Sequence, residues 1–386
     1  KKPTPIQAEV IPAVLNNSDI MAAEQTGTGK TAAFVLPILS KLSNPKYKYK
    51  GHQLRALIVT PTRELAAQVR ESVNTYSKYL SIRSTAVYGG ARIHNQRLKL
   101  RKGIDVLVAT PGRLLDLHNQ KSVNLKNIEM LVLDEADQML DMGFIHDIKK
   151  IDNLLPYRRQ NLMFTATFSD SFRSLAMNMA EKAIEISVTN DNETGENINH
   201  YIHPVDKSRK AELLIELIKT KKWDQALVFT RTKHGADRLQ KQLDKVNINS
   251  KAIHGNKTQN NRMKALEAFK NNKIQILVAT DVAARGIDIK RMSQVINFDV
   301  PTVAKDYVHR IGRTGRGGDM GEAITLVSAD EFRLLRDIEK LINKKLERVE
   351  IEGFEPEHVV PIKDKPNKKR FHNKKGFKKR NKSRKG

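Results

Sequence analysis

The sequence predicts an α/β fold of two tandem domains, each built around a doubly wound parallel sheet. Short apolar runs alternate with helix-like segments along most of the chain, which is the pattern of parallel strands joined by crossover helices. Polar residues 189–197 interrupt this alternation once. The length of 386 residues also exceeds that of one usual hydrophobic core. We therefore expect a first domain over residues 1–188, a linker over 189–197 and a second domain over 198–353.

Each expected strand is a short apolar run, as is typical of strands that are buried on both faces of a sheet. In the first domain these runs are Ile20–Ala23, Ala56–Thr60, Ser84–Tyr88, Val106–Ala109, Met130–Leu133, Asn161–Phe164 and Ala183–Ser187. In the second domain they are Ile198–Pro204, Gln225–Phe229, Ser250–Ile253, Ile276–Ala279, Gln294–Asn297 and Ala323–Val327.

The charge balance indicates a polyanionic partner. The chain has 69 Lys and Arg against 43 Asp and Glu, a formal net charge of +26. Residues 354–386 read as a basic disordered tail, because thirteen Lys and Arg and one Asp fall between Lys363 and Gly386. Phe371 and Phe377 are available there to stack on bases, although a tail that only improves solubility stays an alternative.

The composition narrows the classes of protein further. The absence of cysteine excludes disulfides and cysteine-ligated metals, and it fits a reducing compartment. No apolar run approaches the roughly 20 residues of a membrane span, and no signal peptide precedes the first motif. We therefore expect a cytoplasmic protein without a membrane partner.

The stretch Met21–Thr31 combines an apolar run, a glycine-bearing turn and the start of a helix. Such a turn points its backbone N–H groups and the helix dipole at phosphate. Lys30 would reach the β- and γ-phosphates, and the Thr31 hydroxyl would bind Mg²⁺. Glu24 stands where the usual G-x-x-x-x-G-K-[ST] pattern has its first glycine. Its carboxylate would repel a triphosphate unless it points outward or pairs with a cation, and a plain glycine turn beside a surface lysine is the alternative.

The stretch Met130–Asp137 reads as a buried strand with carboxylates at its end. Ligands of open α/β sheets gather at the carboxyl ends of the strands, so both Asp134 and Glu135 would face phosphates held by Lys30. Asp134 would hold Mg²⁺ directly or through water, and Glu135 would orient and deprotonate the attacking water. An acidic helix start is the simpler interpretation of this stretch. Its combination with the upstream G-K-T favours a site of nucleoside triphosphate hydrolysis.

The two stretches belong to a longer series of short motifs along the chain. In order, these motifs are Pro3–Gln7, Glu24–Thr31, Pro61–Leu65, Gly89–Gly90, Thr110–Arg113, Asp134–Asp137, Thr165–Thr167, Val228–Thr230, Gln259 with Arg262, Thr280–Asp288 and His309–Arg316. With these motifs in this order, the chain resembles the DEAD-box RNA helicases from Lys2 to about Gly353. Two segments, Asp141–Ile148 and Lys305–Arg316, most resemble the bacterial RhlE branch.

The resemblance implies two RecA-like domains that bind ATP and Mg²⁺ between them. Gln7 would select adenine with its amide, although a glutamine on a helix surface is common. Asp288 would meet the ribose or the arginines of the second domain. The implied phosphate-binding residues are Thr26, Gly27, Thr28, Gly29, Lys30 and Thr31.

The resemblance also assigns the catalytic and coupling residues. Arg313 and Arg316 match the arginine fingers that stabilise γ-phosphate charge, and they join Lys30, Asp134 and Glu135 in the catalytic set. A basic turn that faces RNA is the alternative for Arg313. The implied coupling residues, which link hydrolysis to strand separation through Asp137, are Asp137, Thr165, Thr167 and His309.

A third implied set contacts RNA, and its glycines and arginine forks suit close approach to a phosphate backbone. Arg63 alone would read as a solvated helix residue. Arg113 opens a helix, where a cation is disfavoured unless an anion lies nearby, and this slightly favours an RNA contact. The set is Pro61, Thr62, Arg63, Gly90, Thr110 and Arg113 in the first domain and Arg262, Thr280 and Gly286 in the second.

The function that this resemblance implies is an ATP-dependent RNA helicase. ATP-coupled domain closure would locally unwind or remodel short RNA duplexes and RNA–protein complexes. A nucleotide-gated RNA clamp or an annealing chaperone needs the same motifs, and a DNA helicase is a third option. We expect a monomer whose partner is single-stranded or short duplex RNA, with RNA-processing proteins or ribosomal precursors as further candidates.

Overall fold

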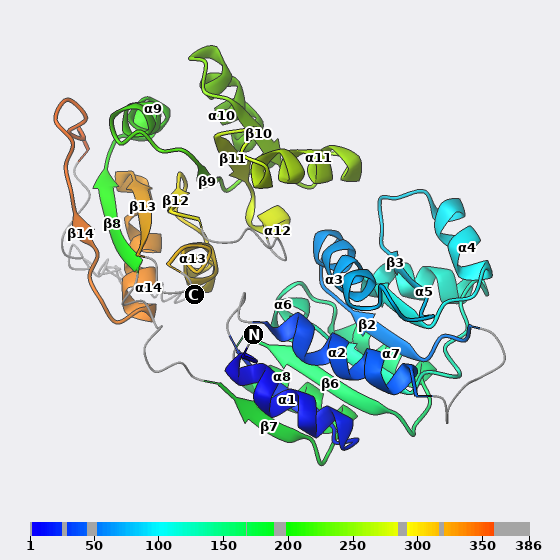
Figure 1. Cartoon of the computed structure of the whole chain (residues 1–386). Coiled ribbons are helices and arrows are strands. Elements are labelled where there is room, and N and C mark those ends of the chain that lie inside the picture. Colours follow the sequence, from blue (N-terminus) through cyan, green and yellow to red (C-terminus); the bar gives the residue numbers. More distant parts are fainter. Residues whose placement is uncertain are drawn as a thin grey trace, which may run out of the picture.

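A computed structural model describes residues 2–24, 29–44, 52–166, 168–188, 198–284, 292–315 and 320–358. Two α/β domains follow one another along the chain, and each has a central sheet with helices on both faces (Figure 1). Over the described residues each sheet has 7 strands, and every pair within it is parallel. The predicted tandem of doubly wound domains is confirmed. The predicted linker 189–197 and residues 359–386 of the predicted tail lie outside the described residues. The predicted start of the disordered tail at 354 is wrong, because Phe354 packs against the core of the second domain and the N–H groups of Glu357 and His358 donate to Asp206.

In the first domain the strand order is β3-β4-β2-β5-β6-β1-β7. The strands are β1 (Ile20–Ala23), β2 (Ala56–Val59), β3 (Ser84–Val87), β4 (Val106–Ala109), β5 (Met130–Leu133), β6 (Gln160–Thr165) and β7 (Ile184–Ser187). The helices are α1 (Pro5–Leu15), α2 (Lys30–Leu42), α3 (Arg63–Tyr76), α4 (Ile93–Arg101), α5 (Pro111–Asn119), α6 (Ala136–Asp141), α7 (Ile145–Leu154) and α8 (Asp170–Met179).

In the second domain the order is β10-β11-β9-β12-β13-β8-β14. The strands are β8 (Ile198–Pro204), β9 (Ala226–Phe229), β10 (Ser250–Ile253), β11 (Ile276–Ala279), β12 (Gln294–Asn297), β13 (Gly321–Val327) and β14 (Glu347–Arg348). The helices are α9 (Lys210–Thr220), α10 (Lys233–Lys245), α11 (Gln259–Lys270), α12 (Asp281–Ala284), α13 (Ala304–Ile311) and α14 (Phe332–Leu341), with short 3₁₀ turns at Lys207–Arg209 and Ala329–Glu331.

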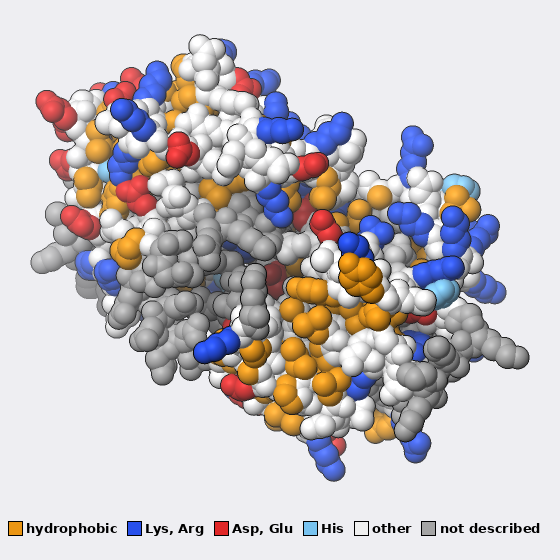
Figure 2. Space-filling view, in the orientation of Figure 1, with side chains coloured by type: hydrophobic (Ala, Val, Ile, Leu, Met, Phe, Trp, Pro, Cys, Tyr) orange, Lys and Arg blue, Asp and Glu red, His pale blue; other side chains and the backbone are white. Residues whose placement is uncertain are grey.

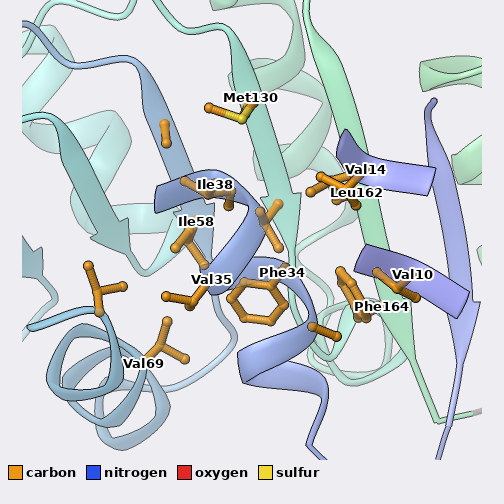
Figure 3. Packing of buried hydrophobic residues seen from close by; sticks show 14 of the residues in the cluster. Val10, Val14, Phe34, Val35, Ile38, Ile58, Val69, Met130, Leu162 and Phe164 are labelled. Carbon is orange, nitrogen blue, oxygen red and sulfur yellow. The ribbon is translucent and has the colours of Figure 1, made fainter. Parts of the chain in front are cut away.

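The first sheet is covered by different helices on its two faces. Residues of α1, α2 and α3 pack on one face, and residues of α5 to α8 pack on the other. Figure 3 shows the first of these layers, where Phe34 of α2 lies against Phe164 of β6 with ring centroids 5.1 Å apart. Val10 and Val14 of α1 belong to the same buried cluster as these two rings (Figure 3). This packing fixes α2, and with it the lysine at its start, against the sheet.

The carboxyl ends of the strands gather the motif loops at one edge of each sheet. In the first domain the segments that follow β1, β2, β3, β4, β5 and β6 are the ones that carry the predicted ATP and RNA residues. Parallel register makes these ends neighbours, as in the pairing of Ala23 with Thr165 between β1 and β6. Across all of the described residues, the helices are too short or too polar to span a bilayer.

Candidate active site

The lysine of the phosphate-loop motif is buried at the start of α2. Lys30 is 7% exposed, and its Nζ donates to the carbonyl oxygens of Glu24 and Thr165, the latter at 3.5 Å. Gly29 precedes it with φ +110°, and a Cβ there would lie 2.5 Å from Nε2 of Gln7. Only glycine fits that position. Thr31 follows in the first turn of the helix, while Thr26, Gly27 and Thr28 lie outside the described residues.

The amide of Gln7 serves the same loop. Its Nε2 donates to the carbonyl oxygen of Gly29 at 3.3 Å, and its Oε1 accepts from the backbone N–H of Thr4 at 3.1 Å. In this structure the amide therefore holds the loop, and its predicted contact with adenine stays a prediction.

Glu24, the departure from the usual motif, lies with its side chain inside the protein. The residue is 4% exposed, so the outward orientation considered for its carboxylate is wrong. Its backbone carries the contacts with the loop, because its N–H donates to Thr165 O at 3.1 Å and its carbonyl oxygen accepts from Lys30. A glutamate is compatible with this backbone role.

The two acidic residues after β5 lie in a desolvated position. Asp134 is 4% exposed and donates its N–H to Val59 O at 3.0 Å. Burial, and then the charge of Glu135, raise the pKa of Asp134 to about 7, against the opposing effect of Lys30. Burial also raises the pKa of Glu135, against the charges of Arg313 and Lys30. Carboxyl groups perturbed in this way are typical of catalytic sites.

The geometry around Glu135 is also unusual. Its backbone is left-handed at φ +54°, which is uncommon for a residue other than glycine. Its Oε2 is buried without a hydrogen-bond partner among the described residues. A buried, unpartnered carboxylate oxygen fits a group that awaits a water or substrate. Together with the buried ammonium of Lys30, these carboxylates fit a nucleoside triphosphate with its metal ion.

The second domain brings cations to this acidic pair. Arg313, which follows α13, is 7% exposed, and its charge lowers the pKa of Glu135 across the boundary between the domains. His309 of α13 has a smaller effect in the same direction. The charges of Lys30 and Arg313 therefore both act on Glu135, although they come from different halves of the chain. Arg316 and Asp288 lie outside the described residues.

Asp137 connects the acidic motif to the segment after β6. Its Oδ2 accepts a hydrogen bond from the backbone N–H of Ala166 at 3.0 Å. This bond joins the two motifs through a backbone donor, and the implied coupling role of Thr165 and Thr167 stays a prediction. Thr167 lies outside the described residues.

The predicted RNA-contacting loops of the first domain lie close together. The guanidinium of Arg63 lies over Gly90, where a Cβ would come within 2.0 Å of Nη1. Arg113 Nη1 donates to the carbonyl oxygen of Ala91 at 3.3 Å, which joins the loop after β4 to the loop after β3. Pro61, Thr62 and Thr110 are buried at the starts of α3 and α5.

The argument that Arg113 needs an external anion is wrong. Its Nε lies 3.4 Å from a carboxylate oxygen of Asp116, one turn along α5. This ion pair supplies the negative charge that a cation at a helix start requires. The predicted RNA contact of Arg113 therefore rests on the family resemblance alone.

The sequence does not predict one buried contact that joins the two domains. Glu64, in the first turn of α3, accepts from Gln259 Nε2 at 2.8 Å and pairs with Arg262 Nη2 at 3.0 Å. Arg262, which we predicted to contact RNA, thus forms an interdomain ion pair here. The only signal available was the spacing of Gln259 and Arg262 on one face of α11. Thr280 lies half-buried after β11, and Gly286 is outside the described residues.

A second unrecognised pair lies inside the second domain. Arg310, 2% exposed, donates to both carboxylate oxygens of Asp281 at 2.5 and 2.7 Å. It also donates to the carbonyl oxygen of Asp299 at 2.8 Å. These bonds fix the end of α13, and Arg313 follows three residues later. Both residues stand in recognised motifs, but nothing in the sequence distinguishes this internal arginine from those that follow it.

Two parallel-sheet domains that share a phosphate-loop lysine, an acidic pair and an arginine define the class of two-domain nucleoside triphosphatases. A family model of the DEAD/DEAH box helicase domain matches residues 4–175, and one of the helicase conserved C-terminal domain matches residues 209–318. The DEAD-box ATP-dependent RNA helicase RhpA of Helicobacter pylori is 40% identical over 358 residues, which are 93% of this chain and 72% of that protein. The chain belongs to the family of DEAD-box ATP-dependent RNA helicases.

Further relatives agree with this assignment. The DEAD-box ATP-dependent RNA helicase CshA of Bacillus cereus is 42% identical over 347 residues, 90% of this chain and 65% of that protein. Among solved structures, S. cerevisiae Dbp5 bound to RNA and ADP BeF3 matches with a TM-score of 0.79 and 33% identity over 90% of both chains. A DEAD box protein from the hyperthermophile Methanococcus jannaschii matches with 38% identity and a TM-score of 0.52, over 90% of this chain and 93% of that one. The resemblance to the RhlE branch stays a prediction.

Proposed function

We propose that this protein is an RNA-stimulated ATPase that uses ATP-coupled domain closure to unwind or remodel short RNA duplexes. The observation that carries the proposal is the electrostatic environment of buried Glu135, on whose pKa the charges of Lys30 from its own domain and Arg313 from the other both act. The catalytic set is assembled from both domains, so hydrolysis depends on how they meet. The likeness to Dbp5 bound to RNA and ADP BeF3 supports the same arrangement.

Each residue has a role that follows from its chemistry. Asp134 and the hydroxyl of Thr31 would hold Mg²⁺, which neutralises charge on the transferred phosphoryl group when bound. Lys30 would bind the β- and γ-phosphates. Glu135, whose carboxyl has a raised pKa, would orient the attacking water and accept its proton. Arg313 would stabilise the charge that develops on the γ-phosphate, with Arg316 as the second finger.

RNA would influence this chemistry through the interdomain contact at Glu64. The carboxylate of Glu64 belongs to the same motif as Thr62 and Arg63, which we propose to contact RNA, and it binds Gln259 and Arg262 of the other domain. RNA that orders this motif therefore favours the arrangement in which Arg313 reaches Glu135. By thermodynamic linkage, ATP favours RNA binding to the same extent.

The test is ATP turnover with and without single-stranded RNA for the wild type, Glu135→Gln and the control Asp141→Asn. Asp141 is exposed at the end of α6, so its variant should behave like the wild type. Glu135→Gln should keep ATP bound but lose turnover, and it should hold RNA longer in the presence of ATP. Turnover near the wild-type rate in Glu135→Gln would show that another group activates the water.

A duplex-unwinding assay separates the helicase from the clamp and the annealing chaperone. Strand release that requires ATP and fails with a non-hydrolysable analogue supports a cycling helicase. Equal release with both nucleotides supports a nucleotide-gated clamp, and faster duplex formation supports an annealing chaperone. DNA strands of the same sequence in the ATPase assay test the third option, a DNA helicase.

A further inference from the structure

Helix α4 has a strongly basic outer face that no part of the proposed ATPase cycle uses. Over Gly89–Gly103 the sequence has five Lys and Arg and no Asp or Glu. Four of these cations, Arg92, Lys99, Arg101 and Lys102, are exposed, and we call them the α4 basic face. Figure 2 shows Lys and Arg side chains gathered over the position that α4 occupies in Figure 1.

The described residues around the α4 basic face do not neutralise its charge. None of its four side chains forms an ion pair with a carboxylate among the described residues. The nearby acidic groups are already engaged, because Asp105 pairs with His52 and Asp116 pairs with Arg113. The positive charge of this face is therefore available to a partner.

The stability of helix α4 explains only some of its positive charges. Lys99 and Arg101 lie in the last turn, where cations suit the helix dipole. Arg92, in contrast, is the N-cap residue and makes no capping hydrogen bond with its side chain. A cation at that end is unfavourable for the helix unless an anion lies nearby. The position of Arg92 therefore favours an external anion over a purely structural role.

Helix α4 is held firmly beside the loops that we propose to contact RNA. Buried Gln96 donates to the carbonyl oxygen of Tyr88 at 3.0 Å, just before Gly89–Gly90. Arg113 donates to Ala91 O on the segment that leads into α4. On the inner side, Ile93 and Leu100 pack against the core cluster of the sheet. The α4 basic face therefore continues the surface of the Gly89–Gly90 loop at a fixed position.

We propose that the α4 basic face binds the phosphates of RNA that runs on beyond the Gly89–Gly90 loop. The proposal rests on the proposed RNA-stimulated ATPase and adds a second contact region to it. The nine residues of α4 span roughly 13 Å at 1.5 Å each. That length matches about four stacked nucleotides at 3.4 Å each. The partner is recognised by its phosphates, so we expect dependence on RNA length and salt rather than on base sequence.

The experiment compares three full-length proteins: the wild type, a variant with Arg92, Lys99, Arg101 and Lys102 changed to Gln, and a matched control. The control changes Arg238, Lys241, Lys245 and Lys251 to Gln, which removes the same charge from exposed positions on α10 and β10 of the second domain. Binding is measured by fluorescence anisotropy with a non-hydrolysable ATP analogue, at several salt concentrations. Two labelled RNAs are used, one of about 7 nucleotides and one of about 20, and circular dichroism confirms that each protein is folded.

The α4 variant should bind the long RNA about tenfold more weakly than the control does, and the short RNA equally well. Its log–log salt slope for the long RNA should become less steep by about 2 to 3, because each neutralised single-strand phosphate contributes about 0.7. ATP turnover at saturating RNA should stay within twofold for both variants.

Two results would overturn the inference. Equal affinities of the α4 variant and the control for the long RNA would show that the face binds no RNA. An equal loss for both RNA lengths would place these residues in the principal RNA site instead. The proposed function and this inference can fail separately. If RNA did not stimulate ATP turnover by the wild type, the proposed function would be wrong. The inference would still hold if the α4 variant lost affinity for the long RNA and not for the short one.

Discussion

The two domains have the same sheet topology and a buried lysine at one corresponding position, but the partners of the two lysines differ. Lys30 begins the helix after β1, and Lys210 begins α9 after β8, which takes the place of β1 in the second sheet. Lys30 hydrogen-bonds backbone carbonyls. Lys210 donates to the carbonyls of Phe298 and Leu326 and, in addition, pairs with the buried carboxylate of Glu331. The second domain thus supplies its own anion where the first would bind phosphate.

The acidic groups after the equivalent strands β5 and β12 show the same contrast. Asp134 and Glu135 lie close to one another in the first domain, and burial raises the pKa of both. After β12, Asp299 accepts a hydrogen bond from the backbone N–H of Arg231 at 2.8 Å. Asp299 thus has a hydrogen-bond partner within its own domain, whereas Oε2 of Glu135 has none among the described residues. A shared fold therefore does not settle which domain binds nucleotide, because single side chains do.

The largest expected effect tests Arg313, which we propose as a catalytic cation that the second domain contributes to the first. Arg313→Ala should lower ATP turnover by on the order of 10³, because it removes charge stabilisation that is needed only in the transition state. The affinities for ATP, and for RNA without nucleotide, should change little. ATPase assays and equilibrium binding measure both, with exposed Arg333→Ala on α14 as the control. Intact turnover with a large loss of nucleotide-free RNA binding would support the alternative of an RNA-facing turn.

The second prediction contrasts the two lysines directly. Lys210→Ala should lower the free energy of unfolding by about 3 kcal/mol, because it removes the fully buried cation from Glu331 and leaves that buried carboxylate with Arg231 as its remaining cation. Lys30→Ala should weaken ATP binding and should cost less stability than Lys210→Ala, about 1 to 2 kcal/mol, because it removes a donor from two carbonyl oxygens but breaks no ion pair with a buried carboxylate. Urea unfolding and ATP titration of both variants separate these outcomes. Replacing Lys210 by Met and Glu331 by Leu together should recover much of the lost stability.

The sequence predicted the strands well, since buried parallel strands appear as apolar runs, and β1, β4, β5, β8, β10, β11 and β12 have the predicted bounds. It did not reveal β14, because Glu347–Arg348 is short and polar and is defined only by its pairing with β8. The burial of Lys210 was equally hidden, since lysine at a helix start normally faces solvent. The contact of Glu64 with Gln259 joins residues 195 positions apart and depends on how the two domains pack.

The third prediction concerns the unsatisfied acidic pair. The folded protein binds a proton at Asp134 with a pKa of about 7, far above the usual 3.8, so its free energy of unfolding should fall as the pH rises from about 4 to about 7. Asp134→Asn removes this dependence and should stabilise the nucleotide-free protein by about 2 kcal/mol above pH 7. Thermal and urea unfolding between pH 5 and 8 measure the difference, with exposed Asp141→Asn as the control. A variant less stable than the wild type at pH 8 would show that Asp134 is satisfied within its domain.

The smallest effect belongs to the contact that joins the two domains. Glu64→Ala removes the acceptor shared by Gln259 and Arg262, which exists only while the domains meet. Each ligand alone should bind nearly as it does to the wild type. The coupling between ligands should fall about tenfold, so that ATP strengthens RNA binding tenfold less and RNA strengthens ATP binding by the same reduced factor.

Thermodynamic reciprocity gives this last prediction an internal check, because ATP and RNA must change each other's affinity by the same factor. RNA affinity is measured with and without a non-hydrolysable ATP analogue, and analogue affinity with and without RNA. The two coupling factors must agree for every variant. Glu71→Ala, exposed on the same helix α3, is the control. Combining Glu64→Ala with Gln259→Ala should add little to the single change, since both remove the same hydrogen bond. Additive losses would mean that the two side chains act separately, and the interdomain contact would then not be the route by which RNA and ATP favour each other.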